Sequence, residues 1–239
     1  SERCYTSREV FESANLIREW RFDLGIQLMV GLPQDSYARD LQTTFRVIEM
    51  QPQAVRIYPT LVIAGTQLET MLRNGRYRPL SLQEAINTCR DMFLLLQAHH
   101  IKVIRMGLYP GEELLRPGTV VAGPIHPSFR ELVEQSVFAL QAGALMTDYL
   151  KSVPCLKAVN LYVNPRDMSK LTGQGRRNLL ELQRRFALES IKVKADAQLK
   201  RDDLGVGSPQ TDKPEKYLGR LEFINAYGLV LNLEKREID

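Results

Sequence analysis

The sequence predicts an α/β fold in which consecutive strand–helix units build a parallel sheet or part of a barrel, followed by a smaller α+β segment. Three strongly apolar runs alternate with helix-type patterns between residues 24 and 109. A strand covered on both faces of a parallel sheet gives such a nearly continuous apolar run. The later part reads instead as strand, helix, helix and strand over residues 157–196. We therefore expect two differently built regions.

A capping box predicts the first helix, because Thr6 is followed three positions later by Glu9. Apolar residues then recur at helical spacing and predict a single buried stripe consisting of Val10, Ala14, Ile17 and Phe22.

The three apolar runs are the predicted strands of the first region. Ser36 is expected to cap the helix after the first run, and Ser81 with Glu84 forms a capping box for the helix that precedes the third. Ligands of parallel α/β folds lie at the carboxyl ends of the strands, so the loops that follow the strands are the candidate site. The predicted strands are residues 24–32, 54–59 and 101–109.

A connector rich in proline and glycine spans residues 110–127, where regular structure is expected to break. His126 before Pro127 is interpreted as a helix-start residue, with contact to substrate as the alternative. A helix over residues 128–149 follows. We expect the polar residues 200–216 to form a flexible loop or tail, and residues 220–234 to form a final hairpin.

Composition bounds the class of protein. The chain has 239 residues, 44% of them hydrophobic and 25% charged, with a formal net charge of +4. Its apolar runs fall far short of the roughly 20 residues that cross a bilayer, so we expect a soluble, cytoplasmic protein without membrane contact. Cys4, Cys89 and Cys155 match no short metal-ligand spacing, and no metal site is expected.

Residues 25–36 (GIQLMVGLPQDS) and 55–85 (VRIYPTLVIAGTQLETMLRNGRYRPLSLQEA) resemble the later half of the radical-SAM barrel in enzymes related to the elongator catalytic subunit. Residues 117–134 are similar to the segment that joins barrel and carboxyl-terminal extension in that family. The resemblance implies a partial parallel (βα) barrel followed by a small α+β, KH-like module. The implied domains are the half barrel (1–110), a connector and linker helix (111–150) and the radical-SAM extension (151–239).

The resemblance implies S-adenosylmethionine and a 4Fe–4S cluster as cofactors of the intact protein. In the family, a three-cysteine motif after the first barrel strand holds the cluster, and this chain lacks that motif. A cluster of this kind needs three closely spaced thiolates. We therefore expect the N-terminal half of the barrel as a partner, and we expect this chain alone to be inactive and to bind neither cofactor.

The family's adenine-binding pattern on its fifth strand maps onto Gln27, Met29, Gly31 and Gln34. Met29 and Gly31 keep an apolar surface and a close backbone approach, whereas Gln27 and Gln34 depart from the pattern. Burial in a sheet without any ligand is the alternative for the apolar residues. The predicted cofactor-binding residues are Gln27, Met29, Gly31, Arg56 and Tyr58, with Arg56 expected on a buried strand beside an acidic or phosphate partner.

Residues 163–196 resemble a KH-type module, whose Gly-x-x-Gly loop grips a nucleic-acid backbone. Ten lysines and arginines but only four acidic residues occur between residues 166 and 201, a net charge of +6. A phosphate-binding surface concentrates basic charge in this way, although a solvated helix face is the alternative. The predicted contacts to tRNA or other RNA are Gly173, Gln174, Gly175, Arg176 and Arg177.

Two functions follow from this reading. The first is the C-terminal part of a radical SAM enzyme that acts on tRNA, with the radical generated in the intact protein. The second is a non-catalytic RNA-binding module in which the half barrel serves only as a scaffold.

Overall fold

The computed structural model describes residues 6–108, 111, 114 and 116–231. The chain divides into two compact units, Ser1–Arg130 and Glu131–Asp239, each with its own sheet. Among the described residues, no helix has the length and apolar character needed to cross a membrane.

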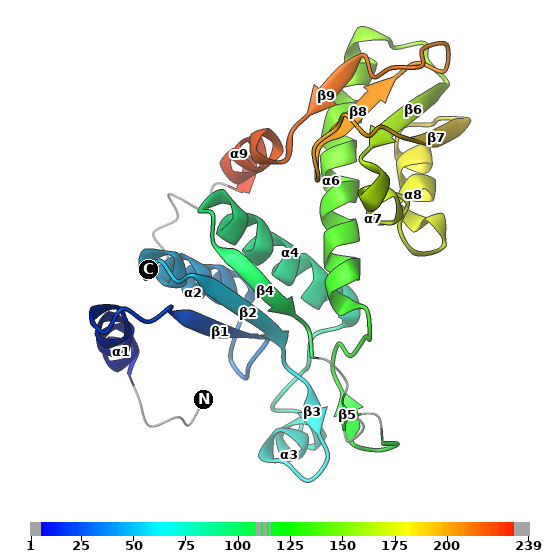
Figure 1. Ribbon diagram of the computed structural model, residues 1–239. Coiled ribbons are helices and arrows are strands. Elements are labelled where there is room, and N and C mark those ends of the chain that lie inside the picture. The colour runs from blue at the N-terminus through cyan, green and yellow to red at the C-terminus, as the bar shows by residue number, and fades with distance from the viewer. Residues whose placement is uncertain (1–5, 109–110, 112–113, 115, 232–239) are drawn as a thin grey trace. The chain divides into compact units, whose positions relative to one another are not determined.

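Unit 1 is built on a three-stranded sheet of order β1-β2-β4, in which both strand pairs are parallel (Figure 1). The predicted α/β class and its parallel sheet are therefore confirmed. A second, two-stranded sheet pairs β3 with β5 in antiparallel fashion. The elements of unit 1 are α1 (Ser7–Glu19), β1 (Gly25–Val30), α2 (Tyr37–Glu49), β2 (Ala54–Pro59), β3 (Val62–Ile63), α3 (Gln67–Arg73), α4 (Leu82–Ala98), β4 (Lys102–Met106) and β5 (Val120–Ala122), and α6 (Phe129–Ser152) begins at its end.

Helices α2 and α4 pack on each other and on one face of the β1-β2-β4 sheet (Figure 1). The fully buried Val30, Val55 and Ile57 point to this face, because alternate residues of a strand share a side. Gln27 and Arg56 point to the opposite face and are exposed. The expectation that both faces of these strands are covered is wrong for this chain.

The predicted capping box of α1 is present, with the Thr6 side chain accepting from Glu9 N–H and the Glu9 carboxylate accepting from Thr6 N–H. The predicted buried stripe is wrong, since only Ala14 of the helix is buried. Val10 is 37% and Phe22 68% exposed. Helical periodicity identifies an apolar stripe but cannot say whether a partner lies against it.

Two features of unit 1 interrupt segments predicted as irregular. β5 lies inside the proline- and glycine-rich connector, where Gly123 packs so closely against Thr60 O that a Cβ atom would stand 2.9 Å away. Helix α3 precedes the predicted loop, with Thr66 accepting from Glu69 N–H as its cap. His126 accepts from Ser128 N–H through Nδ1 at 3.1 Å, just before α6 begins, as expected of a helix-start residue.

Unit 2 contains a four-stranded sheet of order β7-β6-β8-β9, in which β6 and β7 are parallel and the other pairs antiparallel. Its core joins α6, α7 and α8 to one sheet face through Phe138, Leu171, Leu179 and Leu161, all buried. Its further elements are β6 (Ala158–Val163), η1 (Pro165–Asp167), α7 (Met168–Thr172), η2 (Gln174–Arg176), α8 (Arg177–Arg185), β7 (Ser190–Ala195), β8 (Leu204–Gly207), β9 (Lys216–Leu218) and α9 (Arg220–Leu231).

The end of unit 2 differs from the prediction. Residues 200–216 are no flexible tail, because β8 within them is fully buried and Pro214 packs on Gly205. Glycines in β8 provide the close approach that this packing needs. The predicted final hairpin is also wrong, because the described residues from Arg220 onward form α9.

Candidate cofactor face and nucleic-acid-binding loop

The sheet face of unit 1 opposite α2 and α4 carries most of the predicted cofactor residues. We call it the open face and define it by Gln27, Met29, Arg56, Tyr58 and Arg105. Gln27 lies opposite Arg56, and Met29 lies opposite Tyr58, in adjacent rungs of the β1-β2 ladder. The structure therefore places four of the five predicted side chains side by side, as the period of two requires.

Arg56 is exposed and has neither a hydrogen bond nor an ion pair to its side chain among the described residues. The expected buried arginine with an acidic or phosphate partner is thus wrong for the protein part of that site. Sequence reasoning also missed Arg105, which lies opposite Arg56 on β4. Simple alternation from the buried Val103 puts Arg105 on the helix side, and only a β-bulge reverses it.

Met29 and Tyr58 form the rung nearest the carboxyl ends of the strands. Met29 is partly buried and Tyr58 is 8% exposed, so the apolar end of the open face is more covered than its polar middle. An apolar pair of this kind offers a surface on which a planar base can lie. Contact of Met29 and Tyr58 with adenine stays a prediction.

Gly31 follows β1 with φ +75°, a conformation that favours glycine. A Cβ atom here would stand 2.7 Å from Leu80 Cδ1, and the Gly31 carbonyl accepts a 2.7 Å hydrogen bond from the Tyr77 hydroxyl. Packing within the protein therefore explains this glycine by itself. Its predicted role in cofactor binding remains untested. Gln34, which also has positive φ, is exposed, and its carbonyl accepts from the Arg39 guanidinium.

Asp40 is a buried acid beneath the loop after β1 and is only 4% exposed. Its carboxyl group lies within hydrogen-bonding reach of the Asp35 carboxyl and accepts from Gly31 N–H. Burial, followed by the charge of Asp35, raises the pKa of Asp40 to about 8. The two carboxyl groups therefore share a proton at neutral pH, which ties α2 to the loop.

The cysteines do not fit an iron–sulfur cluster. Cys89 is buried, and burial raises the pKa of its thiol, which opposes the thiolate form that metals bind. Cys155 is exposed and belongs to the other unit, and Cys4 lies outside the described residues. Within the described part of the chain, no group of three or more histidines, cysteines or acids is placed to hold a metal ion.

In unit 2 the predicted nucleic-acid loop is formed by η2 between α7 and α8. Gly173, Gly175 and Arg176 have positive φ values of 75°, 57° and 63°. Arg176 thus occupies a left-handed conformation that is uncommon for a residue with a side chain. Its side chain is exposed and has no polar partner among the described residues, so its guanidinium points to solvent from a fixed backbone.

Two buried amide side chains hold this loop. The backbone N–H of Gln174 donates to Gln135 Oε1 at 3.1 Å, and Asn178 Nδ2 donates to the carbonyls of Gln135 and Lys170. Gly173 lies against Asn178, where a Cβ atom would stand 2.9 Å from Asn178 Cγ. These contacts are the physical reason for Gly173.

The loop's own hydrogen bonds limit what it offers to a phosphate. The N–H groups of Arg176 and Arg177 donate to the carbonyls of Gly173 and Gln174, and the N–H of Gln174 is bound to Gln135. The start of α8 has no side-chain cap. Favourable contacts to an anion therefore rest on the Arg176 guanidinium and on the positive end of α8.

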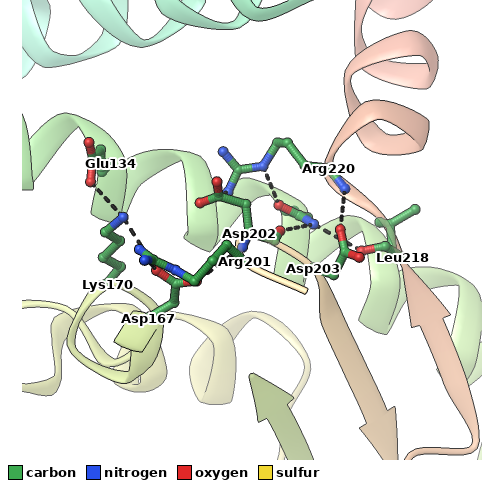
Figure 2. A network of polar contacts seen from close by, with 9 residues as sticks. Glu134, Asp167, Lys170, Arg201, Asp202, Asp203, Leu218 and Arg220 are labelled. Atoms are coloured by element: carbon green, nitrogen blue, oxygen red, sulfur yellow. Dashed lines mark hydrogen bonds and ion pairs between the residues drawn. The ribbon is translucent and has the colours of Figure 1, made fainter. Parts of the chain in front are cut away.

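A network of polar contacts fixes α7 within unit 2 (Figure 2). Asp167 is fully buried and accepts two hydrogen bonds from Arg201, at 2.8 and 2.6 Å, and one from the N–H of Asp202 at 3.0 Å. Burial alone would raise the pKa of Asp167, but these hydrogen bonds and the Lys170 charge hold it below its usual value. Lys170 pairs with Glu134 of α6 at 2.8 Å, which links α7 to α6.

Arg220 at the start of α9 is 7% exposed and donates from Nε to Gln141 Oε1 at 2.8 Å. Gln141 in turn donates to the carbonyls of Asp202 and Leu218 (Figure 2). The guanidinium also lies 4.9 Å from the centre of the Phe138 ring. Together the acids and bases of the network nearly cancel, so it orients α7 and α9 but attracts no anion.

Comparison with known proteins places the middle of the chain. Residues 52–138 match the family described as the Radical_SAM C-terminal domain. The tRNA uridine(34) acetyltransferase of Dehalococcoides mccartyi is 36% identical over 81 residues, which are 33% of this chain and 18% of that protein. Elongator complex protein 3 of Mus musculus is 32% identical over 99 residues, 40% of this chain and 18% of that protein.

The chain thus spans under a fifth of the length of these two curated relatives. Among solved structures, the archaeal Methanocaldococcus infernus Elp3 with an N-terminal deletion aligns with a TM-score of 0.45 and 20% identity, over 64% of this chain and 32% of that one. The family match and both curated relatives agree with the resemblance seen in the sequence. This chain therefore contains a radical SAM C-terminal region of the elongator-like kind.

Proposed function

We propose that this chain is the C-terminal part of a radical SAM enzyme that acts on tRNA, in which an N-terminal half of the barrel holds the 4Fe–4S cluster. The Radical_SAM C-terminal match over residues 52–138 carries this proposal. A relative whose printed name is tRNA uridine(34) acetyltransferase supports the choice of tRNA as the substrate class. Such a reaction would place the protein in the cytoplasm.

The shape of unit 1 supports a half barrel completed by other polypeptide. β1 is the edge strand of its sheet, so one row of its backbone groups has no neighbouring strand among the described residues. Beside it, an open groove of about 400 Å³ lies between α1 and the start of β1, lined in part by Val10, Ile17 and Ile26. A parallel strand with its helix would pair with β1 and cover these apolar side chains.

The described residues do not fit the cluster, as the cysteine positions make clear. They do fit one side of S-adenosylmethionine, because Met29 and Tyr58 present an apolar rung at the carboxyl end of the sheet. When bound, the cofactor would supply a 5′-deoxyadenosyl radical. This chain's own part would be to hold the adenine, to orient it through Gly31 and to exclude water from the rung.

The test of the proposal is anaerobic reconstitution with iron and sulfide. The chain is assayed alone and together with a polypeptide that carries the three-cysteine half barrel. We expect 5′-deoxyadenosine only from the combined sample, and a Met29→Ala, Tyr58→Ala variant should reduce it about tenfold or more. Tyr37→Ala, an exposed position on α2, is the matched control. No product from the combined sample would reject the enzymatic role.

The alternative is a non-catalytic RNA-binding module of KH-like form with the half barrel as scaffold. The exposed guanidinium of Arg176 on a rigid loop favours RNA contact in either case. We expect tRNA binding to weaken steeply between 50 and 200 mM salt, because phosphate contacts release counterions. Arg176→Ala with Arg177→Ala should flatten that slope by about two contacts, whereas Arg46→Ala on α2 should leave it unchanged.

The two readings separate cleanly. Salt-dependent tRNA binding without SAM cleavage by the combined sample supports the binding module. Cleavage with a salt-insensitive tRNA titration supports the enzyme but removes RNA contact from residues 173–177. The three-part division at residues 110 and 150 is part of the same proposal, and limited proteolysis between those positions tests it.

A further inference from the structure

The middle of the open face holds two like charges side by side. Arg56 of β2 and Arg105 of β4 are direct partners across the parallel ladder, and both are exposed. Within the described residues, neither side chain has a hydrogen bond or an ion pair. Like charges opposite each other on adjacent strands destabilise a sheet. Folding therefore provides no reason for this pair.

The backbone is deformed in a way that creates the pair. The register runs from Val55 opposite Val103 to Arg56 opposite Arg105, so Ile104 is an extra residue of β4. Without this bulge, Arg105 would point with the buried Val103 toward the helices. Bulges of this kind re-aim side chains and are frequent beside functional sites.

The bulge is also braced from outside the sheet. Arg130 Nη1 donates a 3.1 Å hydrogen bond to the carbonyl of Val103, next to the extra residue. The direction of the Arg105 side chain is therefore fixed by a specific contact. Gln27, opposite Arg56 on the third strand, adds an exposed neutral amide in the same row.

We propose that Arg56 and Arg105 form a binding site for a phosphate group on the open face, with Gln27 as a neutral hydrogen-bond partner. Adjacent strands are roughly 4.8 Å apart, so both guanidinium groups reach one tetrahedral anion. Each guanidinium offers a planar fork that matches phosphate oxygens. A phosphate with two negative charges balances the two arginines, whereas a single carboxylate leaves one charge unmatched.

This site goes beyond the proposed function, because S-adenosylmethionine carries no phosphate group. The ligand class is a phosphate-bearing small molecule or a nucleotide end that enters from the side of the uncovered sheet. It lies one rung from Met29 and Tyr58, so a bound phosphate and the predicted adenine position would be neighbours.

The experiment titrates the 239-residue chain with pyrophosphate by calorimetry at constant low ionic strength. We expect Arg56→Gln and Arg105→Gln each to weaken binding about tenfold or more, since each removes a charge-assisted hydrogen-bonding fork. Arg46→Gln changes the net charge equally on α2, across the sheet, and should change the affinity less than twofold. Circular dichroism verifies that each variant folds.

Two further arms sharpen the result. Malonate tests a dicarboxylate of comparable charge, and we expect pyrophosphate to bind about tenfold more tightly. Arg176→Gln with Arg177→Gln removes the basic loop of unit 2 and should leave pyrophosphate binding unchanged. Equal affinity for malonate, equal weakening by Arg46→Gln, or loss of binding only in the loop variant would each overturn the proposal. Because no cluster or S-adenosylmethionine is present, its failure is distinguishable from failure of the radical SAM proposal.

Discussion

Both units contain adjacent parallel strands with helices on one face, but they treat the other face differently. In unit 2, Asn160 and Tyr162 of β6 point away from the helices and are still buried, because residues 208–214 cover them. In unit 1, Gln27 and Arg56 occupy the corresponding side of β1 and β2 and are exposed. A sheet face that the chain covers itself is structural, whereas a face left open with unpaired charges is available to a ligand or to further polypeptide.

The largest effect is expected on the covered face. Tyr162 is 2% exposed, and its hydroxyl donates to the Thr211 carbonyl at 2.8 Å. Tyr162→Ala removes a large buried ring and should lower the free energy of unfolding of unit 2 by about 3–5 kcal/mol. Urea unfolding followed by circular dichroism measures this. Tyr217→Ala, at a position on β9 that is 55% exposed, should cost less than about 1 kcal/mol. Equal costs would show that the covering segment is loose.

The next effect depends on pH and concerns the acid under the loop after β1. The folded state holds the pKa of Asp40 at about 8, above its ordinary value. The unfolded chain releases this proton near pH 4, so the stability contributed by protonated Asp40 is complete below pH 4 and falls between pH 4 and 8. Asp40→Asn keeps a donor to Asp35 without an ionisable group, and should raise the free energy of unfolding at pH 8 by about 2 kcal/mol or more.

The measurement is a series of urea unfolding curves at pH 4, 6 and 8. The difference between Asp40→Asn and the parent chain should be smallest at pH 4 and grow up to pH 8. Asp35→Asn removes the neighbouring charge that raises the pKa of Asp40, and should shift the decline of stability to lower pH. A constant difference across the series would show that Asp40 is ionised in the folded protein.

A smaller effect tests whether Gly31 serves packing or a ligand. Gly31→Ala meets both the positive φ and the Leu80 side chain, and should cost about 1–3 kcal/mol. Gly25→Ala at the other end of β1 has nothing within 4 Å of the added Cβ and should be nearly neutral. Leu80→Ala in the Gly31→Ala background should recover part of the loss. Failure to recover any of it would assign the whole cost to backbone strain.

The sequence predicts the order of strands and helices well where local signals decide it. The capping residues Thr6, Ser36 and Ser81 all accept from the backbone N–H three positions later. These are interactions within a few residues, which a sequence pattern contains. The parallel pairing of the three strands follows from the intervening helices.

What sequence reasoning missed depends on contacts between distant residues. The polar composition of residues 200–216 suggests a loop, but Gly205 and Gly207 let that segment pack against Pro214 and Thr211. Arg105 was overlooked because a bulge changes its side, and the bulge is visible only in the pairing with β2. The burial of α1 was overestimated because periodicity does not reveal whether a partner is present.

The smallest effect compares one basic residue from each face. Lys194 of β7 lies 3.3 Å from the Asp212 carboxylate and 5.7 Å from the centre of the Tyr162 ring, so Lys194→Gln should lower the free energy of unfolding by about 0.5 kcal/mol. Arg56→Gln removes repulsion from Arg105 and should raise it by a few tenths of a kcal/mol at low salt. Unfolding curves at 20 mM and 500 mM salt separate the two, because screening should abolish the gain from Arg56→Gln. A loss of stability in Arg56→Gln would mean that the arginine supports the fold. A gain would mean that the open face keeps a charge that folding disfavours, which is the expected signature of a residue retained for binding.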